Sequence, residues 1–345
     1  MRKYQEIADT LETEFATAAP HTRLPGDRNL AARFGVATET VRNALRELKR
    51  TGFLTTRHGV GTFTTGKDAG RPAIGVLVSG CNYSEVFGVM CREIIRAAEE
   101  RQIRVIVKDA SCADVEETAN RTSKLALELA ASRVSGIIYQ PVQFASSAFR
   151  TNCTVLDLFA EARIPVTVID CELAEYPANL SYDLVSIDNF LAGQTLGAWL
   201  IQTGSRHLCF QACPRYAVSV ADRIRGVRSV TNGPVHVMEL DPRDPNAVQS
   251  ELLRVPFADA IICQNDLAAV HMAETLQKLG YRVPEDIRIA GFDGVAISEK
   301  AGIPTMKQPC EDLARGAVSC LLERISRPKS SNMRLLRQAR LLPRG

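Results

Sequence analysis

The sequence predicts an α/β protein with a small helical head and a larger body of alternating strands and helices. Two observations predict this division. Residues 24–65 carry two short amphipathic helix patterns and then two strand patterns around a glycine-rich tip. From Ala73 onward, Val- and Ile-rich runs alternate with helix patterns over about 250 residues. Such alternation is typical of parallel sheets covered by helices.

Composition favours a soluble globular protein of two or three domains over a membrane protein. The chain has 345 residues, of which 46% are hydrophobic and 23% charged, and no apolar run is long enough to span a bilayer. The acidic N-terminus lacks the apolar stretch of a secretory signal. The ten cysteines are scattered without a Cys-x-x-Cys pair, which favours reduced thiols in the cytoplasm over disulfides or a metal site. We therefore expect no metal and no cofactor.

Charge is distributed unevenly along the chain. Residues 1–72 hold 12 Lys and Arg against 8 Asp and Glu, whereas residues 73–323 hold 23 against 31. A basic head on an acidic body predicts nucleic-acid contact at one end only. Residues 324–345 hold 7 basic residues and no acidic ones, which we interpret as a solvated end or last strand rather than a second DNA contact.

Each element of the head follows from a local pattern. In residues 2–16, Ile7, Leu11 and Phe15 share one helical face. The next helices should end at Gly35 and Gly52, and a hairpin should turn at residues 58–61. The expected helices and strands are Asp27–Phe34, Thr38–Arg50, Leu54–Arg57 and Thr62–Thr65. This order of elements predicts a winged helix-turn-helix whose second helix enters a DNA major groove.

The head resembles the DNA-binding domain of the GntR family. The matching residues are Leu24-Pro25, Arg28, Leu30-Ala31, Phe34-Gly35-Val36, Thr40-Val41-Arg42, Ala44-Leu45, Leu48, Gly52 and Gly61-Thr62-Phe63. The resemblance implies that Arg28 and Arg42 lie at phosphates or base edges. It also implies that Thr38, Glu39 and Thr40 begin the recognition helix and that His58 and Gly59 form the tip of the wing.

Two departures from the family pattern concern the helix start and the operator. Gly26-Asp-Arg-Asn29 replaces the usual Ser-Glu-Arg-Glu, so the capping box is lost. Ala37-Thr38 replaces the usual Ser-Arg, whose Arg commonly reads guanine in that family. The family pattern therefore gives no prediction of the operator sequence.

The body is expected to be a two-lobed, doubly wound domain over residues 73–345, joined to the head (1–66) by a linker at 67–72. In order, the expected strands are Ile74–Ser79, Ile103–Lys108, Gly136–Tyr139, Pro165–Asp170, His207–Gln211, Val235–Leu240, Ala260–Cys263 and Ile287–Phe292. The intervening helices are expected at Val86–Arg101, Val115–Ser132, Val155–Ala162 after a long loop, Asn189–Thr203, Ser219–Thr231, Asn246–Leu253, Asp266–Leu279 and Glu311–Arg324.

Polar residues at the ends of these strands predict a sugar-binding cage. Ligands of such sheets bind outside the carboxyl ends of the strands, which here means between the lobes. The candidates are Asp170, Arg223, Asn265, Asp293 and Gln308. An arginine with carboxylates and amides binds vicinal hydroxyls well, because a hydroxyl both donates and accepts.

The same region resembles the LacI/GalR repressors and the periplasmic sugar-binding proteins. The matching motifs are Ile187-Asp-Asn189, Asp222-Arg-Ile-Arg-Gly226, Gln264-Asn-Asp266, Gly291-Phe-Asp-Gly294 and Lys307-Gln-Pro309. The resemblance implies that the five cage candidates bind a sugar. Cys171 departs from the Arg or aromatic residue that relatives often have, and the ring that would stack on the sugar is assigned to Tyr83 or Phe87. The different head and hinge helix of LacI/GalR members are absent.

Simpler roles remain open for the cage candidates. Asp293 and Asn265 can be turn formers or helix caps, Arg223 can form a surface ion pair, and Asp188 is expected to cap the helix at Asn189. No phosphate-binding glycine loop and no nucleophile–base pair occurs in the sequence.

Together these patterns predict a DNA-binding transcription regulator rather than an enzyme. We expect a cytoplasmic homodimer that represses from double-stranded operator DNA and responds to a small sugar, arabinose-like or another carbohydrate. The alternatives are a sugar-binding receptor without a DNA role and an enzyme with a GntR-type regulatory head.

Overall fold

The computed structural model describes residues 3–15, 18–19, 21–50, 53–57, 60–65, 72–80, 85–132, 134–173 and 182–344. It divides into two compact units. The first comprises Met1–Pro72 with Gln102–Arg104, and the second comprises the rest of the chain. No helix in the described ranges is long and apolar enough to cross a membrane.

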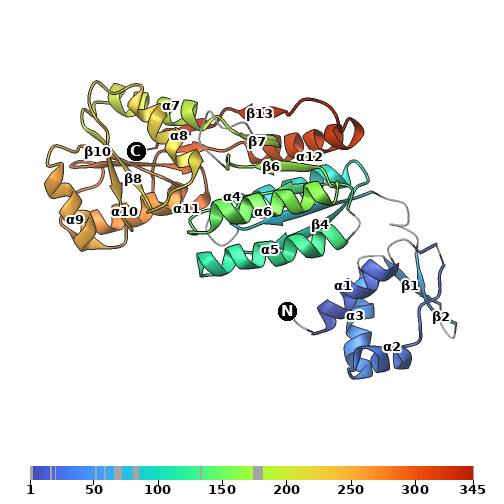
Figure 1. The fold of residues 1–345 in the computed structure, drawn as a ribbon. Helices are drawn as coiled ribbons and strands as arrows, with labels where there is room; N and C mark the ends of the chain where they lie inside the picture. The colour runs from blue at the N-terminus through green and yellow to red at the C-terminus, as the bar shows by residue number, and fades with distance from the viewer. Residues whose placement is uncertain are drawn as a thin grey trace. The chain divides into compact units, whose positions relative to one another are not determined.

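The first unit is a winged helix-turn-helix, which confirms the predicted fold of the head (Figure 1). Its elements are α1 (Lys3–Phe15), α2 (Asp27–Phe34), α3 (Thr38–Arg50), β1 (Leu54–Arg57) and β2 (Gly61–Thr64). The bounds of α2, α3 and β1 are those predicted, because glycine signals and apolar periodicity coincide there. Gly26, at the start of α2, makes no side-chain cap, as the lost capping box implies.

A small apolar core holds the head together. Leu11, Leu30, Val41 and Leu45 are buried where the three helices meet. Gly35 ends α2 with a left-handed φ of 62°, and its N–H is directed to the last carbonyls of that helix. This tight turn brings α2 and α3 together.

The wing has a third backbone segment that the sequence did not reveal. The N–H of Leu24 donates to the carbonyl of Thr62, and the N–H of Thr64 donates to the carbonyl of Thr22. The buried Thr64 hydroxyl also donates to the carbonyl of Ala19. The stretch before α2 therefore pairs with β2 and anchors the hairpin to the helices.

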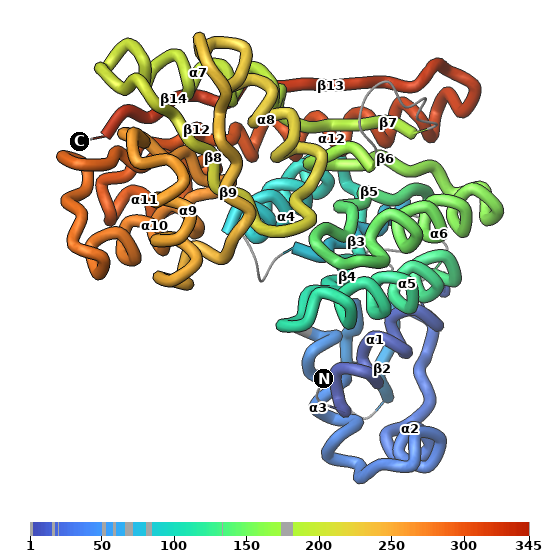
Figure 2. Tube along the Cα trace, turned by 60° about the vertical axis from the view of Figure 1, so that its left-hand side comes forward, coloured from blue at the N-terminus to red at the C-terminus, as the bar shows by residue number. Residues whose placement is uncertain are grey.

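The second unit consists of two lobes, each built on a six-stranded sheet flanked by helices (Figures 1 and 2). Lobe 1 has the strand order β13-β7-β6-β5-β3-β4. Its elements are β3 (Ala73–Val78), α4 (Glu85–Glu99), β4 (Arg104–Asp109), α5 (Val115–Ala131), β5 (Ile137–Tyr139), α6 (Ala148–Glu161), β6 (Val166–Ile169), β7 (Asp183–Ile187), α12 (Cys310–Ser326) and β13 (Arg334–Arg337).

Lobe 2 has the order β14-β12-β11-β10-β8-β9. Its elements are α7 (Asn189–Gln202), β8 (Leu208–Ala212), α8 (Val218–Arg228), β9 (His236–Glu239), α9 (Pro245–Arg254), β10 (Ala260–Cys263), α10 (Asp266–Lys278), β11 (Arg288–Asp293), α11 (Ala296–Lys300), β12 (Thr305–Lys307) and β14 (Arg340–Leu342). Neighbouring strands from β9 to β12 are parallel, and β14 is antiparallel to β12. The predicted doubly wound, two-lobed fold is confirmed.

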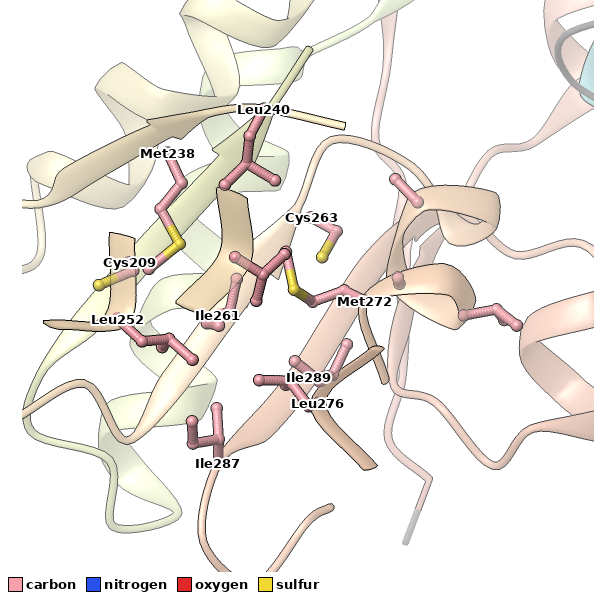
Figure 3. Packing of buried hydrophobic residues seen from close by; sticks show 14 of the residues in the cluster. Cys209, Met238, Leu240, Leu252, Ile261, Cys263, Met272, Leu276, Ile287 and Ile289 are labelled. Atoms are coloured by element: carbon pink, nitrogen blue, oxygen red, sulfur yellow. The ribbon is translucent and has the colours of Figure 1, made fainter. Parts of the chain in front are cut away.

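Buried aliphatic and sulfur-containing side chains pack between sheet and helices in lobe 2 (Figure 3). Ile261 and Ile289 come from neighbouring strands, and Met272 and Leu276 come from α10. Strands with apolar residues on both faces are the reason that the sequence pattern indicated parallel sheets.

The chain passes between the lobes three times: from β7 to α7, from β12 to α12, and from β13 to β14. The N–H of Asp188 donates to the carbonyl of Arg337, which joins the first and third passages. Because the strands end here, the carboxyl edges of both sheets lie beside these hinge segments.

Two sequence expectations need correction. Helix α6 begins at Ala148, seven residues before the expected Val155, and the long loop before it is short. The first turns have weak helix formers, and they are held by buried Asn152, which accepts from the Tyr139 hydroxyl at 2.6 Å and the Val142 N–H at 2.9 Å. The short elements β7, α11 and β12 were not predicted as such, because three to five residues carry too little pattern. The basic end, interpreted from the sequence as a solvated end or last strand, contains β13 and β14, whose residues are exposed or half-buried.

Helices α7 and α8 pack backbone to backbone through two glycines. A Cβ atom at Gly193 would lie 2.1 Å from the carbonyl oxygen of Arg223, and one at Gly226 would lie 2.0 Å from that of Phe190. Backbone atoms cannot move aside as a side-chain end can. The helices are therefore locked at this separation.

We predict that Gly193→Ala and Gly226→Ala each destabilise the second unit, since overpacking costs about 1–3 kcal/mol or more and outweighs the helix-propensity gain of about 1 kcal/mol. The loss of stability can be measured as a lower melting temperature, followed by the fluorescence of Trp199, the single tryptophan, which lies in α7. Gly88→Ala in α4 is the matched control, because its nearest contact would be a side-chain end at 3.7 Å. Equal melting temperatures of all three variants would contradict the packing argument.

Candidate nucleic-acid interface and ligand cleft

The outer face of α3 presents exposed charged side chains. Val41, Leu45 and Leu48 are buried, whereas Arg42 and Arg46 are exposed. Apolar and charged positions therefore separate cleanly on the two sides of this helix, as an exposed recognition helix requires.

Arg42 belongs to an exposed ion-pair network. Its Nε lies 3.2 Å from Oδ2 of Asp27 in α2, and its Nη1 lies 3.7 Å from Oε2 of Glu39. Arg46 lies 3.7 Å from the same Glu39 carboxylate. Pairs this exposed contribute about 0–1 kcal/mol each, so the guanidinium groups can exchange these partners for phosphates or bases at little cost.

The other predicted DNA-contact residues are placed as follows. Arg28 is exposed in the first turn of α2, and Thr38 and Thr40 are half-buried in the first turn of α3. His58 and Gly59 lie outside the described residues, so the predicted wing tip stays a prediction.

In the second unit, the five cage candidates line one cavity of about 60 Å³ between the two lobes. Asp170 comes from lobe 1, Gln308 from the second hinge passage, and Arg223, Asn265 and Asp293 from lobe 2. The other lining residues are Val86, Phe87, Gln143, Phe144, Ser219, Val220 and Gln264. Ligand pockets usually measure about 300–1,000 Å³, so this cleft is narrow and would have to widen for a sugar.

Arg223 is buried, not a surface ion pair. Its Nε donates to Oδ1 of Asn189 at 2.9 Å, and its Nη1 donates to the carbonyl of Gln264 at 2.6 Å. The guanidinium carbon lies 4.5 Å from the centre of the Phe292 ring, a cation–π distance. The sequence did not indicate this cradle of amide, carbonyl and ring.

Asp293 ends β11 and meets Gln308. The Nε2 of Gln308 donates to Oδ1 of Asp293 at 2.8 Å, and both side chains are buried. In lobe 1, Nε2 of Gln143 donates to Oδ2 of Asp170 at 2.6 Å. The amides thus orient both carboxylates toward the cavity.

Two residues are helix caps, as the simpler interpretations allowed. The Asn265 side chain accepts from the N–H of Ala268 at 2.8 Å, and the Asp188 side chain accepts from the N–H of Leu191 at 2.8 Å. Asn265 still lines the cavity, so capping fixes its carbonyl oxygen and leaves its NH₂ group as the donor that can meet a ligand.

An aromatic residue that the sequence analysis did not single out, Phe144, lines the cavity together with the predicted Phe87. Tyr83 lies outside the described residues. Phe144, Asp170 and Asp293 have left-handed backbones with φ of 68°, 80° and 117°. Such strain clusters at functional sites, and no sequence signal marks a bulky residue for it.

Several buried ionisable groups lie close together at the cavity and shift one another's pKa values. Burial raises the pKa of Asp293 to about 7; the positive charge of Arg223 lowers it, while the carboxylates of Asp266 and Asp170 raise it further. Burial likewise raises the pKa of Asp170 and of Asp266 and lowers that of Arg223. One guanidinium therefore has to compensate several carboxyl groups, and hydroxyl groups of a ligand would solvate this charge.

Comparisons with known families agree with this division. Residues 3–64 match the family of bacterial regulatory proteins described as the gntR family, and residues 206–345 match the periplasmic binding protein-like domain. The chain therefore carries a GntR-type winged-helix domain and a periplasmic-binding-protein-like domain.

Several transcription regulators are similar along the chain. An arabinose metabolism transcriptional repressor of Geobacillus stearothermophilus is 25% identical over 323 residues, which cover 89% of this chain and 86% of the relative. The regulator KdgR of Bacillus subtilis (strain 168) is 27% identical over 245 residues, which cover 67% of this chain and 69% of the relative.

Solved structures share the fold. A complex of the transcriptional regulator CelR with cellobiose has a TM-score of 0.66 at 20% identity, covering 93% of this chain and 99% of that one. A LacI family transcriptional regulator from Enterococcus faecalis V583 with bound ribose has a TM-score of 0.64 at 24% identity, covering 79% of this chain and 97% of that one. At these identities the likeness shows the fold alone.

The raised pKa of Asp293 predicts a pH dependence of stability. A folded-state pKa near 7 lies above the unfolded value near 4, so the folded state binds the proton more tightly. The contribution of Asp293 to the free energy of unfolding should fall as the pH rises from about 4 to 7 and then level off. Asp293→Asn should become more stable relative to wild type by about 2 kcal/mol between pH 5 and 7. Denaturant titrations at both pH values measure the difference; a constant difference would show that Asp293 titrates normally.

Proposed function

We propose that this chain, which joins a GntR-type winged-helix domain to a periplasmic-binding-protein-like domain, is a DNA-binding transcription repressor controlled by a small carbohydrate. The observation that carries the proposal is the convergence of Arg223, Asn265, Asp293, Gln308 and Asp170 on one interlobe cavity. In the same chain, α3 exposes the cationic face of a recognition helix.

The head would read double-stranded operator DNA with α3 in the major groove. Arg42 and Arg28 supply positive charge for phosphates or guanine edges, and Thr38, Glu39 and Thr40 lie at the helix start, where base contacts concentrate. A homodimer would place two such helices about 34 Å apart on a roughly two-fold site.

The cleft would bind a carbohydrate through its hydroxyl groups. The carboxylate oxygens of Asp170 and Asp293 can accept hydrogen bonds, whereas Arg223 and the Asn265 amide can donate them. Each of two neighbouring sugar hydroxyls could therefore donate one hydrogen bond and accept another. Phe87 and Phe144 add apolar surface for the carbon face of a sugar. Relatives with names that refer to arabinose and structures that hold cellobiose or ribose support this ligand class.

Ligand binding would control the operator by shifting the lobes. If only one lobe arrangement spaces the two heads correctly, a coupling of about 1–3 kcal/mol changes DNA affinity by roughly 5- to 150-fold. We infer that the sugar weakens operator binding and so relieves repression in the cytoplasm.

The alternatives lack such support. The regulators named above argue against an enzyme, and a receptor without a DNA role would leave the charged face of α3 unused. A fluorescence-anisotropy titration of the DNA fragment upstream of its own gene, with L-arabinose, D-ribose and cellobiose added in turn, tests the proposal. Binding that no sugar alters would count against it.

We predict that Arg42→Ala weakens operator binding. If Arg42 contacts a base, the affinity should fall roughly 5- to 150-fold, which corresponds to the 1–3 kcal/mol of a good base contact. If Arg42 contacts a phosphate, the slope of log affinity against log salt concentration should become shallower by about one. Stability should change by about 0.5 kcal/mol or less, because the ion pairs of Arg42 are exposed. Arg33→Ala is the matched control, since Arg33 is similarly exposed and pairs with Glu14 of α1. Equal affinities of the two variants would remove Arg42 from the interface.

We also predict that Arg223→Lys loses sugar affinity while sugar-free operator binding is unchanged. Lysine keeps the charge, but its single nitrogen cannot occupy the positions of both Nε and Nη1, which bond to Asn189 and to the Gln264 carbonyl, and also reach a ligand. A loss of about 1–3 kcal/mol raises the Kd roughly 5- to 150-fold. Calorimetry measures it, and an unchanged Kd would remove Arg223 from the site.

A further inference from the structure

The first hinge passage carries a buried amide. Asn189 is the first residue of α7 and follows directly on Asp188, which is bonded through its backbone to Arg337 of the third passage and caps α7. Asn189 is only 7% exposed. The bonds of Asp188 at the hinge therefore fix where the Asn189 side chain lies.

This amide holds the arginine of the cage. Its Oδ1 accepts from Arg223 Nε at 2.9 Å, and its Nδ2 lies 3.4 Å from the carbonyl of Ile187 at the end of β7. Nε cannot face a ligand while Asn189 occupies it, so the bond directs the terminal nitrogens of the guanidinium.

The helices on either side of this bond pack too closely to slide past each other. Gly193 and Gly226 bring the backbones of α7 and α8 into contact, so α8 cannot slide while α7 stays. A rotation at residues 188–189 must therefore carry Arg223 with it.

The second hinge passage repeats the arrangement. Gln308 follows β12, is buried, and donates to Asp293 at 2.8 Å. Two passages between the lobes thus each place a carboxamide on a charged residue of the cage.

Resting on the proposed function, we propose that Asn189 is a positioning residue that orients Arg223 toward the sugar. A sugar bonded to both Arg223 of lobe 2 and Asp170 of lobe 1 would favour the hinge geometry in which both side chains reach it, and the Asn189 bond fixes the Arg223 end of that span.

Three variants test this role by calorimetry with whichever of L-arabinose, D-ribose and cellobiose binds wild type. Asn189→Ala should raise the Kd about tenfold or more, and Asn189→Asp, which keeps the acceptor, should stay within about threefold. Thr275→Val is the control: it removes a buried 2.7 Å bond to the Pro242 carbonyl in lobe 2 and should change stability only. An Asn189→Ala variant with wild-type Kd, or an Asp variant as weak as Ala, would overturn the proposal.

A second readout needs no sugar. The Nε–H resonance of Arg223, assigned by its loss in Arg223→Lys, should exchange slowly with water in wild type and in Asn189→Asp. In Asn189→Ala, exchange should be about tenfold faster or more. Unchanged exchange would overturn the positioning role. If wild type binds none of the sugars, the proposed effector class fails, whereas this exchange measurement still decides the role of Asn189.

Discussion

The second unit depends on the compensation of one buried positive charge. Arg223 lies between the lobes and is only 5% exposed, and its cost of burial is offset by the Asn189 amide, the Gln264 carbonyl, the face of Phe292 and the charges of nearby carboxyl groups. None of these partners belongs to the helix that carries Arg223. The charge is therefore stabilised only where the hinge and the strand ends are both in place.

The geometry of the cage depends on the close packing of α7 against α8. Gly193 and Gly226 remove the side chains that would separate α7 from α8, and this closeness lets Asn189 reach Arg223. In lobe 2, buried Asp266 accepts from the hydroxyls of Ser298 and Thr305 at 2.7 and 2.6 Å and from the N–H of Val295 at 3.0 Å. These bonds hold the left-handed turn after Asp293. The contacts that hold lobe 2 together thus also position residues that line the cavity.

The two units use charge in opposite ways. On α3 the ion pairs of Arg42 and Arg46 are exposed and cheap to break, which suits side chains that exchange partners on a polyanion. In the cleft the charges are desolvated and held, which suits selective recognition of a small neutral ligand. This contrast follows from burial, not from residue type, because arginine serves in both places.

The sequence by itself determined most of the helices and strands and the five polar residues of the cage. Apolar periodicity and glycine stops predicted the bounds of α2 and α3, and polar residues at strand ends predicted the side chains that line the interlobe cavity. Only the tertiary structure decided that Asn189 cradles Arg223, that Phe144 lines the cavity on a strained backbone, and that β13 and β14 complete the two sheets. The physical reason is the distance along the chain over which each signal acts. Periodicity is a local signal that shows which face of an element is buried. A hydrogen bond between residues 34 positions apart depends instead on how whole helices pack.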